Sequence, residues 1–349
     1  MTRLFVAFED RLLRVDERTE GSWSTATVLS GPRFEAVAAH PEAPSRVFCG
    51  TFDRGLHRST DGGDTWRRVG ERTIRPDTIT AVAVDPSDAS VVYAGTEPSR
   101  VYRSGDGGES WEHRDGLADL ESARQWSFPP RPHTHHVRWI EVDPQDPDRL
   151  HVSIEAGALV RSFDAGETWT DTVPTARWDV HSLASHPDAP DHLWAAAGDG
   201  YAESTDGGDT WDHPEEGLTK RYCWSVAVDP GDPDTVLVSA AAGPRTAHRS
   251  ARAESYVFRK RGGGSWAQLA GDLPTGEGVL RYEFAPGSAL GELYAASNVG
   301  VFRTPDAGDS WDRLDGGLPD DLESRTVTGV AVVARERVST SSRYSSASL

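Results

Sequence analysis

The chain has 349 residues and a formal net charge of −19 at pH 7, with 55 acidic residues against 36 basic ones. Because binding to duplex nucleic acid needs a positive surface, this balance argues against nucleic acid as a partner. Lys occurs only at positions 220 and 260, so almost every basic residue is Arg. An acidic, Lys-poor surface resembles that of proteins from salt-loving organisms, although a GC-rich genome also favours Arg over Lys.

The N-terminal residues and the two cysteines bear on the cellular compartment. Arg3, Glu9 and Arg11 interrupt the apolar residues of the N-terminus, which therefore does not read as a signal peptide. The sequence has no apolar stretch of transmembrane length. Cys49 and Cys223 lie in apolar strand patterns without C-x-x-C spacing, which predicts free buried thiols. We expect a cytoplasmic monomer that does not interact with membranes.

Short alternating runs rich in β-branched residues predict strands along nearly the whole chain. The first three runs lie at 4 to 9, 11 to 16 and 23 to 29. Thereafter a strand A opens each repeat, and these strands lie at 34 to 41, 79 to 86, 137 to 144, 180 to 187, 223 to 230, 280 to 287 and 327 to 334. Runs such as VFCGT and VVYAGT follow as strands B, and runs such as GLHRS and RVYRS as strands C. Strand D is expected to begin at a Trp.

That Trp ends an octapeptide of the form S-x-D-x-G-x-T-W. STDGGDTW stands at 59 to 66 and 204 to 211, with close variants at 104 to 111, 162 to 169 and 304 to 311, and shorter relics end at Trp23 and Trp266. Successive Trp markers are 42 to 58 residues apart, the period of a four-stranded propeller blade. The Asp accepts hydrogen bonds from backbone N–H groups and the Gly supplies positive φ, so we expect a structural turn rather than a calcium or catalytic site.

The octapeptide resembles the Asp-box, or BNR repeat, of sialidase-like propellers, sortilin ectodomains, two-propeller xyloglucanases and photosystem II assembly factors. The resemblance covers residues 3 to 334. It implies an all-β fold, a single seven-bladed β-propeller of four-stranded antiparallel blades that occupies residues 1 to 334. It says little about function, because those relatives do unrelated jobs.

The two ends of the chain predict how the ring closes. Residues 4 to 29 supply strands B, C and D with no strand A before them, while 327 to 334 is a strand A with nothing after it. Pairing the two completes one blade and removes exposed sheet edges. The Ser-rich residues 335 to 349 are expected to form a flexible tail.

Loop topology assigns every connection to one of two faces. The A–B and C–D loops share one face, which is regular because the octapeptides lie there. The B–C and D–A loops share the other, and the two long Trp spacings arise from insertions on it, at 112 to 136 and about 241 to 255. Loops elaborated on one side of a rigid scaffold favour a functional site there. Neutral drift is the alternative, since long loops cost little.

Each insertion carries basic residues. His133, His135 and His136 end the first insertion just before a strand A. If extended, His133 and His135 point the same way, which favours a divalent metal site; a solvated hydrogen-bonding patch is the alternative. The second insertion is basic from Arg245 to Arg252 and suits either a lid over an anion or a loose surface loop.

The position six residues before the Pro that closes strand A is expected at the mouth of the central channel. It is occupied by Glu35, Thr80, Arg138, His181, Trp224 and Leu280. Further candidate ligand-binding residues nearby are Arg177, Arg221, Tyr222, Arg281, Glu155, Glu97 and Asp53. Several Arg residues at one mouth of an acidic protein indicate an anion site. The alternative is that they pair with carboxylates of neighbouring blades.

Three classes of function follow. The favoured one is a binding or assembly module that presents this His- and Arg-rich face to a small anionic or sugar-like ligand, or to a protein or peptide. The second is a metal- or Arg-dependent lyase or hydrolase of small molecules that uses the His cluster. The sialidase resemblance implies a third, glycoside hydrolysis. Against it, the chain has seven repeats rather than six, lacks an F-R-I-P stretch and offers no assignable Tyr–Glu pair. The sequence identifies no catalytic residue.

Overall fold

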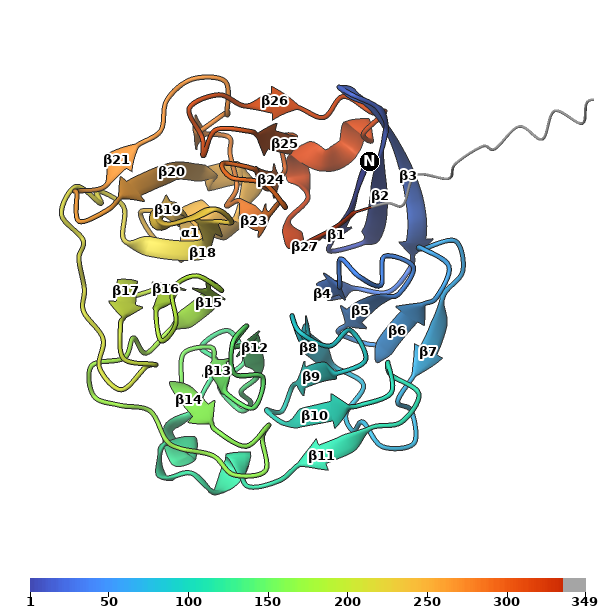
Figure 1. Ribbon diagram of the computed structural model, residues 1–349, viewed down its shortest axis with the longest axis vertical. Helices are drawn as coiled ribbons and strands as arrows, with labels where there is room; N and C mark the ends of the chain where they lie inside the picture. Colours follow the sequence, from blue (N-terminus) through green and yellow to red (C-terminus); the bar gives the residue numbers. More distant parts are fainter. Residues whose placement is uncertain (335–349) are drawn as a thin grey trace, which may run out of the picture.

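The computed structural model describes residues 1–334, which form seven antiparallel sheets arranged as blades around a central channel (Figure 1). Blade 1 consists of β4 (Phe34–Ala39), β5 (Val47–Thr51), β6 (Leu56–Ser59) and β7 (Arg67–Val69). Blade 2 consists of β8 (Ile79–Val84), β9 (Val92–Thr96), β10 (Val101–Ser104) and β11 (Glu112–Arg114). Blade 3 consists of β12 (Val137–Val142), β13 (Leu150–Ile154) and β14 (Ala158–Ser162).

The chain continues around the ring in the same order. Blade 4 consists of β15 (Val180–Ser185), β16 (Leu193–Ala197) and β17 (Gly200–Ser204). Blade 5 consists of β18 (Tyr222–Asp229), β19 (Asp232–Ala241), β20 (Glu254–Arg261), β21 (Ala267–Gln268) and β22 (Gly276–Glu277). Blade 6 consists of β23 (Glu283–Pro286), β24 (Leu293–Ser297), β25 (Gly300–Thr304) and β26 (Asp312–Arg313).

Blade 7 closes the ring with strands from both ends of the chain. Its order is β27 (Val327–Ala334), β1 (Thr2–Phe8), β2 (Arg11–Thr19) and β3 (Ser22–Ser30). β27 pairs antiparallel with β1, so that Phe5 lies opposite Ala331. The predicted seven-bladed fold and its closure are therefore confirmed. The tail predicted at 335–349 lies outside the described residues.

The hydrophobic core lies between adjacent blades rather than within one sheet. Trp194 and Tyr201 of blade 4, for example, pack against Val226 and Val238 of blade 5 in one buried cluster. Trp266, a marker of the repeat, joins them edge-on, with its ring centroid 4.8 Å from that of Tyr201. Both faces of a blade therefore pack against neighbouring blades, and middle strands such as β5 and β9 are buried at every position.

The octapeptides form turns held by their own side chains. At 204–211 the Ser204 hydroxyl donates to Oδ1 of Asp206 at 2.8 Å, and the Gly208 N–H donates to Ser204 Oγ at 2.9 Å. The N–H and hydroxyl of Thr210 donate to the same carboxylate at 2.9 and 2.6 Å. Gly207 and Gly208 have φ values of +69° and +88°, where side chains are disfavoured. The same bonds recur at 59–65, 104–110, 162–168 and 304–310.

The outer strands of blades 3 and 4 are shorter than expected. Strand D was expected to begin at Trp169 and Trp211, but each blade has only one bridge there, Arg161 to Thr170 and Glu203 to Asp212. Pro174 and Pro214 follow closely in the sequence. Because Pro has no N–H to donate to a ladder, it ends the pairing.

Short helices occur in the insertions and before β27. They are η1 (Leu117–Asp119), η2 (Glu121–Gln125), α1 (Pro244–His248), η3 (Ser250–Arg252) and η4 (Asp320–Ser324). Among residues 1–334, no helix has the length and apolar character needed to span a bilayer. Cys49 and Cys223 are buried and free, as the sequence predicts.

Candidate functional site

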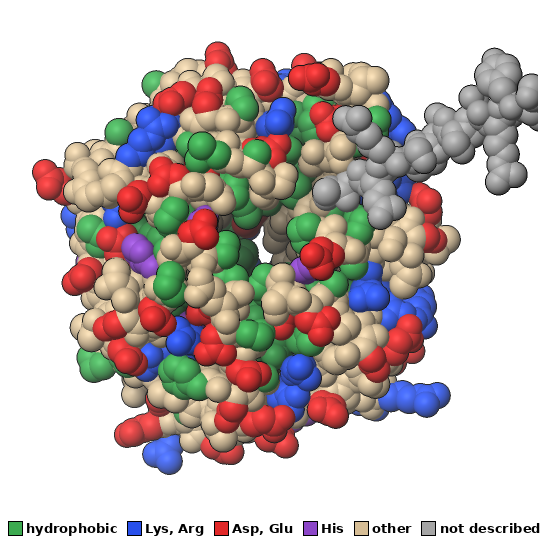
Figure 2. All heavy atoms as spheres, viewed as in Figure 1, with side chains coloured by type: hydrophobic (Ala, Val, Ile, Leu, Met, Phe, Trp, Pro, Cys, Tyr) green, Lys and Arg blue, Asp and Glu red, His purple; other side chains and the backbone are tan. Residues whose placement is uncertain are grey.

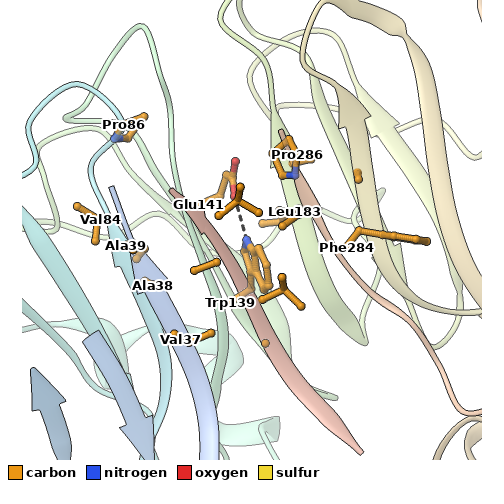
Figure 3. A pocket seen from close by; sticks show the side chains of 18 of the residues that line it. Val37, Ala38, Ala39, Val84, Pro86, Trp139, Glu141, Leu183, Phe284 and Pro286 are labelled. Atoms are coloured by element: carbon orange, nitrogen blue, oxygen red, sulfur yellow. Dashed lines mark hydrogen bonds between the residues drawn. The ribbon is translucent and has the colours of Figure 1, made fainter. Parts of the chain in front are cut away.

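The centre of the ring is open in the space-filling view of Figure 2, and two cavities lie along the channel. The first, of about 550 Å³, is lined by the later residues of the inner strands and by the prolines that follow them. Figure 3 shows its small apolar side chains, among them Val37, Ala39 and Leu183. Glu141 in this lining accepts a hydrogen bond from Trp139 Nε1 at 2.9 Å. The lining is mostly apolar, and its charged side chains are Arg138, Glu141, Glu283 and Glu292.

The second cavity, also of about 550 Å³, is lined by both insertions and is here called the insertion-face cavity. Phe128 and Arg131 come from the first insertion, and Arg245 and His248 come from the second. The sequence-based prediction that both insertions lie on one face is therefore confirmed.

A β-bulge turns one side chain of most inner strands toward this cavity. In β4, Phe34 pairs with Thr51 and Ala36 with Gly50, so Glu35 between them is unpaired. The same irregularity leaves one residue unpaired in five other inner strands, at Thr80, Arg138, His181, Trp224 and Thr328. Bulges re-aim side chains and are common next to binding sites. The slot identified from the sequence is this bulge, and all of these residues except His181 line the cavity.

Blade 6 departs from the pattern. Leu280 was expected at the channel mouth, but it is 1% exposed and belongs to the core. β23 begins only at Glu283, so the segment before it is not paired as in the other blades. Arg281 lines the cavity in place of Leu280.

Trp224 is the centre of the arrangement. The guanidinium carbons of Arg281 and Arg138 lie 3.9 and 4.7 Å from the centroid of its ring. Its Nε1 donates to Oε1 of Glu283 at 2.5 Å. His181 packs on the same ring with centroids 4.3 Å apart. One indole from blade 5 thus orders side chains of blades 3, 4 and 6.

Arg281 is a buried cation whose hydrogen-bonding capacity is not used. The residue is 5% exposed, and its Nε and Nη1 have no hydrogen-bond partner within residues 1–334. Burial lowers its pKa, Glu283 opposes this, and the nearby Arg138 reinforces it. Unsatisfied buried donors are costly, so they point to a group that they bind in use.

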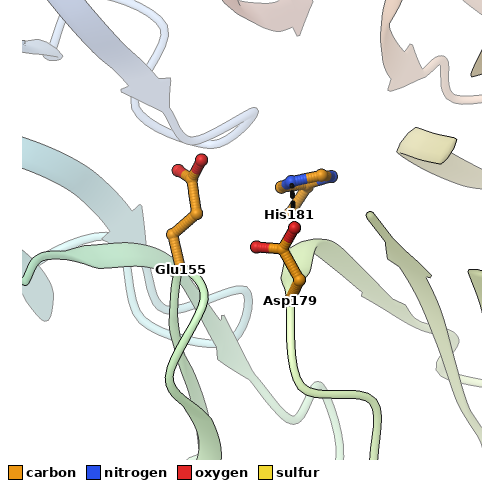
Figure 4. Close-up of side chains that lie close together, drawn as sticks. All are labelled: Glu155, Asp179 and His181. Carbon is orange, nitrogen blue, oxygen red and sulfur yellow. Dashed lines mark ion pairs between the residues drawn. The ribbon is translucent and has the colours of Figure 1, made fainter. Parts of the chain in front are cut away.

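Glu155, Asp179 and His181 form a second cluster beside the cavity (Figure 4). The Nδ1–H of His181 donates to the carbonyl of Cys223 at 2.7 Å, and its Nε2 lies 3.6 Å from Oδ2 of Asp179. Glu155 Oε2 accepts from His136 Nε2 at 2.8 Å. Burial opposes ionisation of Glu155, but the hydrogen bond from His136 and the positive charge of Arg138 hold the pKa of Glu155 well below its usual range.

Tyr222 and His248 form a neutral pair on the cavity wall. The Tyr222 hydroxyl and Nε2 of His248 are hydrogen-bonded at 2.9 Å. Burial, assisted by Arg281, lowers the pKa of His248 to about 2, and burial raises that of Tyr222 above its usual range. Neither group carries charge at neutral pH, so this part of the cavity wall is polar but uncharged.

Several sequence-predicted residues lie elsewhere. Arg177 and Arg221 both pair with Glu215, at 2.6 and 3.4 Å, and neither lines the cavity. Here the alternative of pairing with nearby carboxylates holds. Asp53 is half exposed and accepts from the Arg33 N–H at 3.2 Å. Glu97 binds Arg131 through two hydrogen bonds of 2.9 and 2.5 Å and supports the cavity wall from behind.

The three histidines of the first insertion do not converge. His133 is exposed, Nδ1 of His135 lies 2.8 Å from Ser99 Oγ, and His136 binds Glu155. Across the described part of the chain, the only group of three potential ligands with atoms within 4.8 Å of one another is Glu155, Asp179 and His181. His135 and His136 lie in the loop before β12 and contact different blades, since Ser99 lies between β9 and β10 of blade 2 and Glu155 directly follows β13 of blade 3.

Several lining residues are not among the candidate ligand-binding residues that the sequence predicted. Phe128, Arg131, His248 and Arg249 line the cavity from the insertions, and Asp179 precedes His181 by two residues. Asp179 could have been found because it directly precedes β15, two residues before the predicted channel-mouth residue His181. The sequence identified the second insertion only as a lid or a loose loop, and loop conformation is not periodic, so the individual side chains that line the cavity could not be singled out. The lining has six Arg against four acidic side chains, in contrast to the acidic chain as a whole: Arg33, Arg131, Arg138, Arg245, Arg249, Arg281, and Glu9, Glu35, Glu155, Asp179.

Comparison with known proteins supports the fold and leaves the function open. No protein-family model matches the chain, and no curated protein matches it. Among solved structures, the GH74 xyloglucanase from Xanthomonas campestris superposes with a TM-score of 0.66 at 17% identity, over 94% of this chain and 52% of that one. The chain thus spans about half of that enzyme.

Two similar structures are comparable in length to this chain. YCF48 bound to D1 peptide has a TM-score of 0.58 at 16% identity, over 82% of this chain and 83% of its own. The WD40 propeller domain of Doa1 has a TM-score of 0.56 at 12% identity, over 87% and 88%. At such identities the likeness concerns the propeller fold alone.

Proposed function

We propose that this propeller is a binding module for a small polyhydroxylated carboxylate, a sugar acid, held in the insertion-face cavity. The observation that carries the proposal is the buried Arg281, whose Nε and Nη1 lack partners within the described chain. Arg presents paired donors whose geometry matches a carboxylate, and such charge-assisted bonds are among the strongest hydrogen bonds. A ligand carboxylate on the edge formed by Nε and Nη2 would accept from Nε, and a ligand hydroxyl on the opposite edge would accept from Nη1.

The other side chains of the cavity wall suit a ligand that carries several hydroxyl groups. Tyr222 supplies a flat aromatic surface, while Glu35 and Asp179 supply acceptors for ligand hydroxyls. The Nε of Arg33 lies 3.0 Å from Oε1 of Glu35 but is not aligned for a hydrogen bond, so this oxygen is free to accept one. Aromatic walls with a few placed polar groups are typical of small-molecule sites, and about 550 Å³ falls within their usual range.

A peptide is the second candidate, because one of the similar structures is YCF48 bound to D1 peptide. A C-terminal carboxylate would offer Arg281 the same group. We favour a sugar acid because the acceptors of the wall match hydroxyl donors, whereas a peptide body presents mostly amides and apolar side chains.

The test is isothermal titration with matched pairs of ligands, such as glucuronate and glucose, in a buffer that contains a chelator. Glucuronate should bind at least tenfold more tightly than glucose, because only its carboxylate engages Arg281. Arg281→Gln should remove most of that difference. The matched control is Arg221→Gln, which removes an Arg outside the cavity and should leave affinity unchanged.

The panel should include short peptides with free and amidated C-termini. If a peptide with a free C-terminus binds tightly and no sugar acid does, the ligand is a peptide and the proposed ligand class is wrong. Equal affinity for acids and neutral sugars would contradict the role of Arg281.

A further inference from the structure

We infer that Glu155, Asp179 and His181 form a binding site for one transition-metal dication such as Zn²⁺. Atoms of the three residues lie within 4.8 Å of one another (Figure 4). The inference goes beyond the proposed function and does not depend on it, because Arg281 is not among the three metal ligands, although Asp179 and Glu155 also line the cavity.

The tautomer of His181 carries the argument. Because its Nδ1 donates to the Cys223 carbonyl at 2.7 Å, the neutral imidazole has its lone pair on Nε2. A backbone carbonyl on the far nitrogen is the usual support of a metal-ligating His. His181 is fully buried, and its Nε2 has no hydrogen-bond partner among residues 1–334. A metal ion bound to Nε2 would give this buried lone pair the partner that it lacks.

The spacing of the atoms fits coordination better than hydrogen bonding. Nε2 of His181 lies 3.6 Å from Oδ2 of Asp179, which is too far for a hydrogen bond. Two ligands bonded at about 2.1 Å in tetrahedral geometry lie about 3.4 Å apart. The observed separation is close to that value, so a metal would need little rearrangement of this pair.

Hydrogen bonds from neighbouring residues fix the orientation of both carboxylates. Oδ1 of Asp179 accepts from the Ala156 N–H at 2.9 Å, which leaves Oδ2 toward His181. Oε2 of Glu155 accepts from His136 at 2.8 Å, which leaves the other oxygen for an ion. Such supporting bonds fix ligand orientation in metal sites. Glu155 and Asp179 also line the cavity, so a bound metal would keep an open position toward a ligand.

The ligand set selects the class of metal. Two carboxylates and one neutral imidazole together neutralise a dication, and the nitrogen ligand favours Zn²⁺ over Mg²⁺ or Ca²⁺, which prefer oxygen alone. Arg138 opposes binding, because its Nε lies 3.8 Å from Oε2 of Glu155. Removing that charge should tighten metal binding while it weakens anion binding.

The experiment is titration of the chelator-treated, dialysed protein with Zn²⁺ alone. Wild type should bind one equivalent. Asp179→Asn should weaken binding at least tenfold, because the amide keeps an acceptor for Ala156 but loses the charged ligand. His213→Gln, which removes an exposed imidazole outside the cavity, should bind as wild type does and controls for surface chelation. Arg138→Gln should tighten Zn²⁺ binding severalfold.

Circular dichroism and thermal unfolding of each variant confirm that it is folded. A wild-type protein that binds no stoichiometric Zn²⁺ would overturn the inference. So would a folded Asp179→Asn variant that binds Zn²⁺ as tightly as wild type. Either result leaves the proposed sugar-acid site standing, since that site is measured in the presence of a chelator.

Discussion

The guanidinium carbon of Arg281 lies 3.9 Å from the ring centroid of Trp224, and this contact joins blade 6 to blade 5 at the channel mouth. A cation–π contact offsets part of the hydration that a buried guanidinium loses, but it satisfies none of its N–H groups. Arg281 is therefore costly to the folded protein in the absence of a ligand.

That cost predicts that Arg281→Met stabilises the protein while it weakens binding of a sugar acid. Replacing a poorly compensated buried charge by an apolar side chain of similar length should raise the free energy of unfolding by about 1 to 3 kcal/mol. Denaturant unfolding measures the first effect and titration calorimetry the second.

Arg58→Met is the matched control for this substitution. Arg58 is equally buried, but it binds Glu109 and the carbonyl of Gly107. Its replacement should destabilise the protein. If Arg281→Met destabilises it as much as Arg58→Met does, Arg281 is a structural residue and the cost assigned to it is wrong.

Ring closure predicts different effects for two truncated chains. A chain ending at residue 325 lacks β27 and leaves β1 with an exposed edge, so it should lose cooperative thermal unfolding. A chain ending at Ala334 retains β27 and should unfold cooperatively. Calorimetry distinguishes them, and similar cooperative transitions for both chains would show that the blade 7 pairing is dispensable.

The octapeptide turns are predicted to contribute stability and not binding. Asp206→Ala removes the acceptor of three hydrogen bonds in its turn, and by comparison with lost helix caps it should cost about 1 to 2 kcal/mol. Thr205→Ala, an exposed change in the same turn, is the control. A stable Asp206→Ala variant that no longer binds ligand would instead place function on the regular face.

His151 predicts a loss of stability in acid. It is fully buried, and its Nε2–H donates to the Gly207 carbonyl at 3.1 Å. Burial, opposed by the hydrogen bond to Gly207 and reinforced by the charges of Arg161 and Arg149, lowers the pKa of His151 to about 4. The unfolded chain takes up the proton near pH 6.5, so stability should fall by about 3 kcal/mol between pH 6.5 and 4.

Denaturant unfolding at pH 7 and pH 4 measures this contribution. His151→Gln should be less sensitive to acid than wild type, whereas His213→Gln, which changes an exposed imidazole, should resemble wild type. An unaltered pH dependence in His151→Gln would mean that other groups cause the acid loss.

Because the sequence repeats, most of the fold could be predicted from it. Trp spacing and alternation gave seven blades and the closure through β27, because a propeller repeats one local rule. Pro spacing located Glu35, Arg138 and Trp224 in one slot, which the structure explains by a recurring bulge. The rule fails in blade 6, where β23 starts late and Arg281 takes the place of Leu280.

Pairings between side chains could not be read in the same way. Arg177 and Arg221 are close in sequence to residues that line the channel mouth, yet both pair with Glu215. His136 binds Glu155, which directly follows β13, and does not share a partner with His133 or His135. Such choices depend on distances across strands and blades, which no sequence periodicity records.

The most direct test of the central claim is a crystal structure of the protein soaked with glucuronate. We predict density in the insertion-face cavity, with the carboxylate within hydrogen-bonding distance of the Arg281 guanidinium and the sugar ring against Tyr222. Density in the opposite cavity, on the octapeptide face, or with the carboxylate turned away from Arg281 would contradict the account.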